Sequence, residues 1–382
     1  RIDMKYCSTC LQPDTRPNTK FTNDQLCPAC NYYKEESAKA DWNERFEILQ
    51  DLLIKFKKEK KKGQFFDCII GVSGGKDSTR QALWVRDKLG LNPLLVCLTY
   101  PPEQLTERGV NNLSNLIELG FDVIVSALAP ETWRKMLKQG FYQFTNWAKS
   151  SEMAILSAVP QIAIKYNIKY IFWGENPGLQ LGDMSTIGKT GYDGNNLKYM
   201  NTVQGGDLEW LTEAGFKKET LMPYSYPSST EFDNAGIQII YLGWFWRDWS
   251  IINNGVYSSL EGLEIREDTV ENTGDLLGIF SLDEDWVTLN QMIKYYKYGF
   301  GRVTDYCNEE IRLGNLSRDE GIILANEYDD ACSDEYINSF CEYIRISPKQ
   351  FWSKVRSSVN RDLFHVHKNG DIVKKFTVGR GL

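Results

Sequence analysis

The most constraining feature of this sequence is a glycine-rich segment between a strand-like run and a helix-like run. The segment reads Gly-Val-Ser-Gly-Gly-Lys-Asp-Ser and covers residues 71–78. The apolar run at 65–72 predicts a strand, and the pattern at 79–89 predicts a helix that closes at Gly90. A turn in this context presents unpaired N–H groups and the positive end of a helix dipole to an anion. The sequence therefore predicts a phosphate-binding turn.

Each residue type in this turn suits an anion or its counterion. Glycines let backbone N–H groups approach an anion without a Cβ clash, and serine hydroxyls and a lysine add donors. Asp77 cannot favour phosphate directly, so we expect it to hold Mg²⁺ or to fix the loop. The alternative is a plain glycine-rich turn that caps a helix. The candidate nucleotide-binding residues are Ser73, Gly74, Gly75, Lys76, Asp77 and Ser78, and Lys76 and Asp77 are also candidate catalytic residues.

Strand-like and helix-like runs alternate after this turn, which is typical of βαβ units. We therefore predict an α/β fold with a parallel sheet. Ligands bind at the carboxyl ends of such strands, which adds Thr99 and Gly174 as candidate nucleotide-binding residues, and Glu175 and Asn176 as further candidates. Glu175 is also a candidate catalytic residue, and a plain loop carboxylate is the alternative for it. Strands are predicted at 93–99, 121–127 and 170–173, helices at 106–119, 130–149 and 152–166, and further strand candidates at 221–224 and 236–242.

The turn lacks the G-x-x-x-x-G-K-[ST] spacing of a Walker A loop. Its Ser-Gly-Gly-x-Asp-Ser core closely resembles the PP-loop signature of ATP pyrophosphatases. The resemblance implies an adenine nucleotide alpha hydrolase-like domain that binds ATP. In that family the loop grips the β- and γ-phosphates, which leave together as pyrophosphate, and the AMP moiety passes to a substrate oxygen.

Two cysteine pairs near the N-terminus have the spacing of a metal site. Cys7 and Cys10 form one C-x-x-C pair, Cys27 and Cys30 form the other, and 16 residues separate the pairs. Four thiolates complete a tetrahedral shell, so we predict a structural Zn²⁺ site in a module too small for a large core. A redox or iron–sulfur role is the alternative.

Composition narrows the possible partners and the compartment. The net charge of −7 argues against nucleic-acid binding, and the lysine-rich run at 55–62 is interpreted as a solvated helix face. An apolar run of about 18 residues, as a membrane span needs, is absent from the sequence. Nine cysteines without a disulfide-scaffold spacing predict a reducing compartment, the cytoplasm.

The chain is expected to contain three regions. Residues 4–40 form the cysteine module, 41–260 the ATP-binding α/β domain and 261–382 a mainly helical C-terminal region. A capping box, Ser317 with Glu320, marks one of its helices. The polar, glycine-rich stretch at 178–206 is long for a structureless connection, so we expect a functional lid there.

Three features together resemble the N-acetyl sugar amidotransferase family of bacterial surface-polysaccharide pathways. They are the four-cysteine module directly before the loop domain, the segment Trp-Gly-Glu-Asn-Pro at 173–177, and the C-terminal segments at 297–305 and 311–320. The resemblance implies that ATP adenylates the acetamido oxygen of a nucleotide-linked N-acetyl sugar and that ammonia then displaces AMP. It also implies that Asn176, Arg302, Asp305 and Arg312 are candidate substrate-binding residues.

The histidine content bears on the source of the ammonia. His365 and His367 are the only histidines, which argues against a glutaminase site of the Cys–His or Ser–His–Asp type inside this chain. The family resemblance implies a separate glutaminase like the histidine-pathway subunit, and it admits a cyclase-like companion. Two other functions stay open: a tRNA-modifying PP-loop enzyme of the thiolase type, and a non-catalytic nucleotide-binding scaffold subunit.

Overall fold

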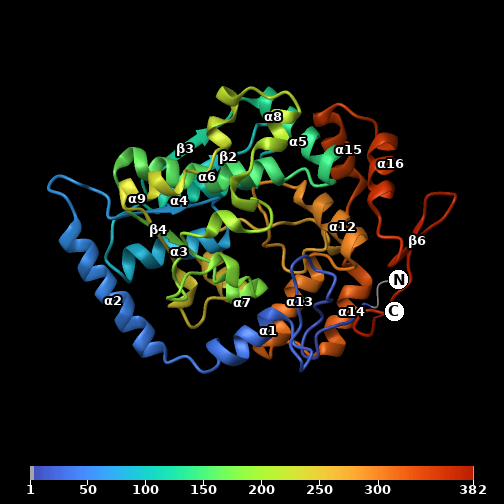
Figure 1. The fold of residues 1–382 in the computed structure, drawn as a ribbon, viewed down its shortest axis with the longest axis horizontal. Helices are drawn as coiled ribbons and strands as arrows, with labels where there is room; N and C mark the ends of the chain where they lie inside the picture. The colour runs from blue at the N-terminus through green and yellow to red at the C-terminus, as the bar shows by residue number, and fades with distance from the viewer. Residues whose placement is uncertain (1–3, 382) are drawn as a thin grey trace.

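The computed structural model describes residues 4–381, and its centre is a five-stranded sheet (Figure 1). All neighbouring strands are parallel, in the order β3-β2-β1-β4-β5. The predicted α/β fold is confirmed, and the run at 236–242 adds β5, whereas the run at 221–224 lies in a 3₁₀ helix. The strands are β1 (Cys68–Gly71), β2 (Pro93–Thr99), β3 (Val123–Ala127), β4 (Tyr170–Trp173) and β5 (Gln238–Tyr241).

The strand order creates a crevice at the carboxyl edge of the sheet. The chain leaves β1 toward β2 and β3 on one side, and it later returns to place β4 and β5 on the other side. Loops after β1 and β4 therefore diverge above neighbouring strands, which is where open α/β sheets bind their ligands. The phosphate-binding turn and the segment 174–176 both lie at this point.

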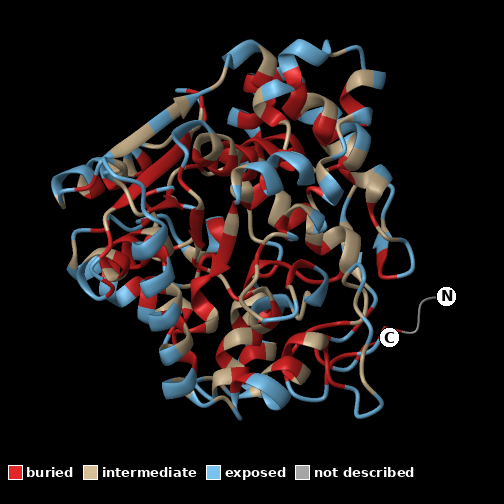
Figure 2. Cartoon of the chain, turned by 60° about the vertical axis from the view of Figure 1, so that its left-hand side comes forward, coloured by how far each residue is buried: buried red, intermediate tan, exposed pale blue. Residues whose placement is uncertain are grey.

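Helices cover both faces of the sheet, because alternate residues of each strand point to opposite sides. Ile69 and Ile171 pack with α5 and α6, whereas Ile70 and Phe172 pack with α2 and α3. Figure 2 shows the central strands buried, while the edge strand β3 is half exposed. The covering helices are α2 (Trp42–Glu59), α3 (Lys76–Asp87), α4 (Glu107–Glu118), α5 (Pro130–Phe144), α6 (Lys149–Tyr166) and α9 (Ser229–Ala235). In residues 4–381, no helix has the length and apolar character needed to cross a bilayer.

The polar stretch at 178–206 folds as short helical turns against the sheet. The Gly194 N–H donates to the Ile239 carbonyl (2.8 Å), and the Tyr241 hydroxyl donates to the Thr186 carbonyl (3.0 Å). These bonds tie the stretch to β5, and its function as a lid stays a prediction. Its turns are α7 (Pro177–Leu181), η2 (Met184–Thr186), η3 (Leu197–Tyr199) and η4 (Gln204–Gly206).

The C-terminal third is helical, as predicted, and ends in a small hairpin. The capping box of Ser317 and Glu320 is present at the start of α14. The helices are α12 (Val287–Tyr298), α13 (Arg302–Leu313), α14 (Arg318–Tyr328), α15 (Asp334–Ile344) and α16 (Pro348–Ser358), followed by β6 (Phe364–Val366) and β7 (Ile372–Lys374). Preceding them, α10 (Ile251–Leu260) packs on α3.

The cysteine module docks on the C-terminal helices rather than on the sheet (Figure 1). Leu11 is buried with Val303 and Cys307 of α13, and its backbone N–H donates to the Asn308 Oδ1 atom at 2.8 Å. α1 (Pro28–Tyr32) also packs against α7. The N-terminal module is therefore held by elements that follow it by hundreds of residues.

One aromatic core joins the α/β region to the C-terminal helices. Phe340 of α15 is fully buried, and its ring centroid lies 5.7 Å from that of Phe141 and 5.5 Å from that of Trp286. We expect Phe340→Ala to destabilise the protein by about 3–5 kcal/mol, because it leaves a cavity in this core. Unfolding followed by tryptophan fluorescence and by circular dichroism should still give one coincident transition. Two separated transitions would show that the regions unfold independently.

Candidate functional site

The turn between β1 and α3 has the backbone form of an anion site. Gly74 has φ +86°, and a Cβ there would lie 2.9 Å from the Asn112 backbone. Gly75 is the N-cap of α3, and its N–H donates to the Ser73 Oγ atom at 3.2 Å. The N–H groups of Lys76, Asp77 and Ser78 form the first helical turn, which has no earlier carbonyl to bind within the helix. These donors suit a phosphate.

Polar contacts from α10 hold the first turn of α3. The Lys76 ammonium donates to the Asp77 Oδ2 atom at 2.7 Å, and the Asn254 Nδ2 group donates to the Asp77 Oδ1 atom at 2.7 Å. Ser258 donates its hydroxyl to the Lys76 carbonyl at 2.6 Å, and Arg80 donates to the Asn254 Oδ1 atom at 2.7 Å. Asp77 thus fixes the loop in this structure, and half of its side chain remains exposed toward solvent, where a cation could bind.

Three adjoining cavities lie along the carboxyl edge of the sheet, and we name them by position. The loop cavity, about 430 Å³, contains the turn and the end of β4. The central cavity, about 320 Å³, shares Lys76 and Asp77 with the loop cavity. The large cavity, about 560 Å³, shares Trp173 and Glu175 with the loop cavity and shares Gln180 and Gln291 with the central cavity.

Some of the predicted nucleotide-binding residues line the loop cavity, and others shape the backbone around it. The loop cavity is lined by Ser73, Lys76, Asp77, Ser78, Gly174 and Glu175. Gly74 and Gly75 instead shape the backbone of the turn. Thr99 is directed toward the Tyr100 carbonyl (3.5 Å), and Tyr100 lines the cavity in its place. Gly174 has no room for a side chain, because a Cβ would lie 2.8 Å from the Trp249 ring.

Glu175 lies where the loop cavity meets the large cavity. Burial, and then the nearby Asp77 carboxylate, raise the pKa of Glu175 to about 7, although Lys76 opposes the shift. A carboxyl group with this pKa can gain or lose a proton near neutral pH. Asn176, by contrast, is nearly fully buried and caps α7 by accepting from the Leu179 N–H at 3.3 Å, while it also lines the central cavity.

The predicted substrate residues of α13 have three different environments. Arg302 lines the central cavity; its Nη1 donates to the Thr273 carbonyl (3.2 Å), and its buried Nη2 has no partner within residues 4–381. Asp305 also lines the central cavity and forms ion pairs with Lys294 and Arg16. Arg312 donates to the Leu179 carbonyl (3.1 Å) and lies beside the Cys30 thiol.

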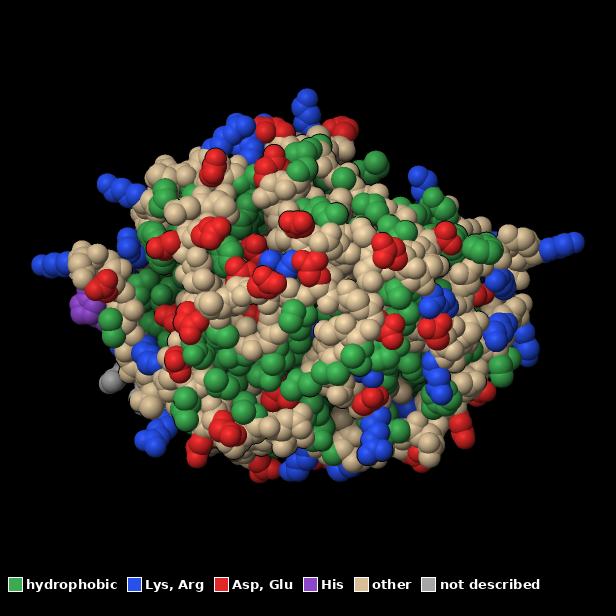
Figure 3. Space-filling view, turned by 180° about the vertical axis from the view of Figure 1, so that it is seen from behind, with side chains coloured by type: hydrophobic (Ala, Val, Ile, Leu, Met, Phe, Trp, Pro, Cys, Tyr) green, Lys and Arg blue, Asp and Glu red, His purple; other side chains and the backbone are tan. Residues whose placement is uncertain are grey.

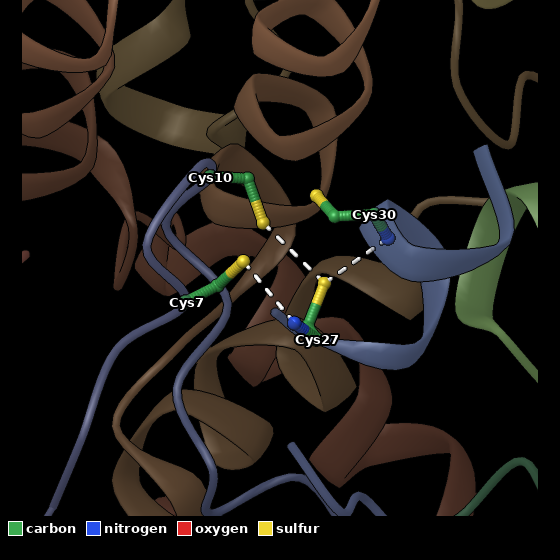
Figure 4. A group of neighbouring side chains, drawn as sticks. All are labelled: Cys7, Cys10, Cys27 and Cys30. Atoms are coloured by element: carbon green, nitrogen blue, oxygen red, sulfur yellow. Dashed lines mark hydrogen bonds between the residues drawn. The ribbon is translucent and has the colours of Figure 1, made fainter. Parts of the chain in front are cut away.

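Figure 4 shows the four predicted cysteines directed toward one another. All four Sγ atoms lie within 4.8 Å of one another and are buried. Backbone N–H groups donate to the Sγ atoms of Cys7 and Cys27, from Cys27 (3.2 Å) and Cys30 (3.4 Å) respectively. Such donors favour thiolates. In a tetrahedral site with Zn–S bonds of about 2.3 Å, the four sulfurs lie about 3.8 Å from one another. The cluster therefore fits one Zn²⁺, which would crosslink the two ends of the module.

A comparison with known protein families matches one region of the chain. Residues 275–377 match the family described as "LPS biosynthesis protein WbpG-like, C-terminal domain". The C-terminal helices therefore carry a WbpG-like domain, which confirms the resemblance to surface-polysaccharide proteins over that part of the chain. No curated protein matches the sequence.

Two solved structures overlap the chain weakly. The NH3-dependent NAD synthetase from Campylobacter jejuni is 15% identical, with a TM-score of 0.29 over 60% of this chain and 100% of that chain. The U34-tRNA thiolase NcsA from Methanococcus maripaludis is 12% identical, with a TM-score of 0.28 over 79% of this chain and 88% of that chain. Neither overlap is close enough to transfer a substrate or a residue role.

We expect the cysteine cluster to hold about one zinc ion per chain, and Cys27→Ser to lose it, because three thiolates and a hydroxyl bind zinc far more weakly. Metal content is measured by mass spectrometry after purification without added zinc. Cys332→Ser, which changes a cysteine outside the cluster, is the matched control and should keep its metal. Full zinc retention in Cys27→Ser would contradict the assignment.

The raised pKa of Glu175 predicts a pH-dependent stability in the absence of nucleotide and Mg²⁺. Its protonated form is favoured in the fold, so its contribution is present below about pH 4.5 and is lost as pH rises through 7. The free energy of unfolding of Glu175→Gln, relative to that of the wild type, should therefore increase by about 2–3 kcal/mol when the pH is raised from 5 to 8. Denaturant titrations at both pH values measure this difference. The exposed Glu213→Gln is the control, and an equal difference in both variants would contradict the assignment.

Proposed function

We propose that this protein is an ATP-dependent, AMP-forming amidotransferase that converts the acetamido group of a nucleotide-linked N-acetyl sugar into an acetamidino group. The product would serve lipopolysaccharide, O-antigen or a related glycan. The observation that supports this most is that the cavity at the phosphate-binding turn adjoins, at Glu175, a larger cavity lined by both apolar and charged side chains. The WbpG-like domain at 275–377 supports the surface-polysaccharide context.

The proposed reaction has two steps. First, the amide oxygen attacks the α-phosphorus of ATP, the bond between the α- and β-phosphates breaks, and pyrophosphate leaves. Ammonia then adds to the activated carbon, and AMP leaves with the former amide oxygen. Adenylation is needed because an amide oxygen is a very poor leaving group.

The residues of the turn match the charge changes of the first step. Lys76 and the N–H groups of the first turn of α3 would stabilise the charge on departing pyrophosphate. Asp77 is the candidate ligand of Mg²⁺, which would neutralise phosphate charge. Glu175, with a pKa of about 7, would accept a proton from the attacking ammonium or ammonia.

A separate glutaminase subunit is the proposed source of ammonia, with a cyclase-like companion as a further candidate partner. Within this chain, His365 and His367 are the only histidines, and both lie at the terminal hairpin, outside the lining of the three cavities. On the face shown in Figure 3, acidic and basic side chains are mixed and form no continuous basic track. The net charge is −7, and a phosphate backbone is usually bound by a basic surface, so RNA is the less favoured substrate.

The first experiment is incubation with Mg·ATP, ammonium and a panel of nucleotide-linked N-acetyl sugars, with products resolved by mass spectrometry. We expect AMP, pyrophosphate and a sugar lighter by about one mass unit, because NH replaces O. AMP formed only with bulk tRNA would favour the RNA-modifying function. A chain that consumes no ATP, with or without a glutaminase, would favour the scaffold function.

Asp77→Asn tests the turn within the same assay. We expect pyrophosphate release to fall by on the order of 100-fold or more without loss of fold, because the change removes one carboxylate and keeps the shape of the side chain. Asp87→Asn, an exposed aspartate at the other end of α3, is the matched control and should keep full activity. Retained pyrophosphate release in Asp77→Asn would contradict the assignment of the turn as the ATP-phosphate site.

A further inference from the structure

The cysteine module contributes a charged side chain to the wall of the large cavity. Arg16 lies in the loop between the two cysteine pairs, and its Nε donates to the Gln12 Oε1 atom at 2.8 Å. Its guanidinium carbon lies 4.5 Å from the centroid of the Phe300 ring, and its Nη2 pairs with Asp305. Arg16 and Phe300 both line the large cavity.

A second cation reaches the same carboxylate from a different helix. Lys294 of α12 donates to the Asp305 Oδ2 atom at 2.6 Å and lies 5.1 Å from the Phe300 centroid. Burial alone would raise the pKa of Asp305, but Arg16 and Lys294 outweigh it and hold the pKa below its ordinary value. One carboxylate thus keeps two cations side by side, and the pair retains a net positive charge.

The cation pair has donors left for a ligand. A guanidinium has five N–H donors and an ammonium has three, and the contacts above use two and one of them. Lys297, which donates to the Phe144 carbonyl at 3.0 Å, adds a third cation to the lining of the same cavity. Two carboxylates, Glu152 and Asp183, also line the cavity. Asp183 is engaged as the N-cap of η2, and burial raises the pKa of Glu152.

Two side-chain amides also line the large cavity, whose remaining lining is largely apolar. The Asn290 Oδ1 and Gln291 Oε1 atoms are buried and have no hydrogen-bond donor within residues 4–381. Buried acceptors of this kind are ordinarily paired, and a donor of a ligand reaches them only after rotation of the amide. A cation pair, side-chain amides and Glu175 in the lining of one cavity suit a phosphorylated, polyhydroxylated acceptor.

We propose that the large cavity is the acceptor site and that Arg16 and Lys294, positioned by Asp305, bind the diphosphate or phosphate of a nucleotide-linked sugar. The assignment rests on the proposed function for the identity of the acceptor. It makes the cysteine module part of the substrate site, because the loop that carries Arg16 is anchored at both ends by cysteines of the cluster. The acetamido end of the acceptor then meets the loop cavity at Glu175.

The test measures binding to the zinc-loaded full chain by calorimetry. The probes are UDP-N-acetylglucosamine and CMP-N-acetylneuraminate, with free N-acetylglucosamine as the probe without phosphate and Mg·ATP as the probe of the loop cavity. We expect Arg16→Gln and Lys294→Gln each to weaken the better nucleotide sugar by at least tenfold. Both variants should leave the affinity for Mg·ATP within twofold, and free N-acetylglucosamine should bind the wild type far more weakly than its nucleotide form.

Lys20→Gln is the matched control, because it removes an exposed cation from the same loop of the module; it should change neither affinity. Arg16→Lys keeps the charge and should recover part of the lost affinity. Lys294→Gln lies outside the module and decides the matter if Arg16→Gln loses zinc. Nucleotide-sugar affinity that is unchanged in both Lys294→Gln and Arg16→Gln would overturn this assignment while leaving the proposed function intact. A wild type that binds Mg·ATP but neither nucleotide sugar would overturn both.

Discussion

The site depends on unpaired backbone N–H groups at the start of α3. A helix cannot satisfy its own first-turn donors, and here the strand before it delivers them to the crevice between β1 and β4. Gly74 makes the sharp entry into the helix possible through its positive φ. The surrounding polar contacts protect this arrangement: α10 anchors the Lys76 carbonyl and the Asp77 carboxylate. The shape of the turn thus depends on α10 as well as on the glycines.

Burial and ion pairing together set the ionisation of the carboxyl groups around the crevice. Burial and the Asp77 carboxylate raise the pKa of Glu175 to about 7, whereas two cations hold the pKa of Asp305 below its ordinary value. Glu175, after β4, lines the large cavity, and Asp305, on α13, lines the neighbouring central cavity. The sheet therefore contributes a group that can exchange a proton, and the C-terminal helices contribute fixed charge.

Local sequence patterns predicted the parts of the site that local structure determines. The turn at 71–78, the alternating strands and the four cysteines each have a signal within a few residues, and the structure places them as expected. Arg16, Lys294 and Asn254 gave no such signal, because their importance arises from contacts with distant segments. The same limit applies to α13: nothing local distinguishes Arg302, which lines the central cavity, from Arg312, which faces the cysteine cluster.

The docking of the cysteine module has a consequence for how this protein is made. Leu11 contacts Asn308 across 297 positions of the chain, and Arg16 contacts Asp305 across 289. A ribosome adds about 5–20 residues per second, so the module leaves the exit tunnel tens of seconds before α13 exists. During that interval its four thiols are exposed and its docking surface is missing. Early capture of a metal ion would shield these thiols from oxidation and aggregation until the last helices arrive to cover them.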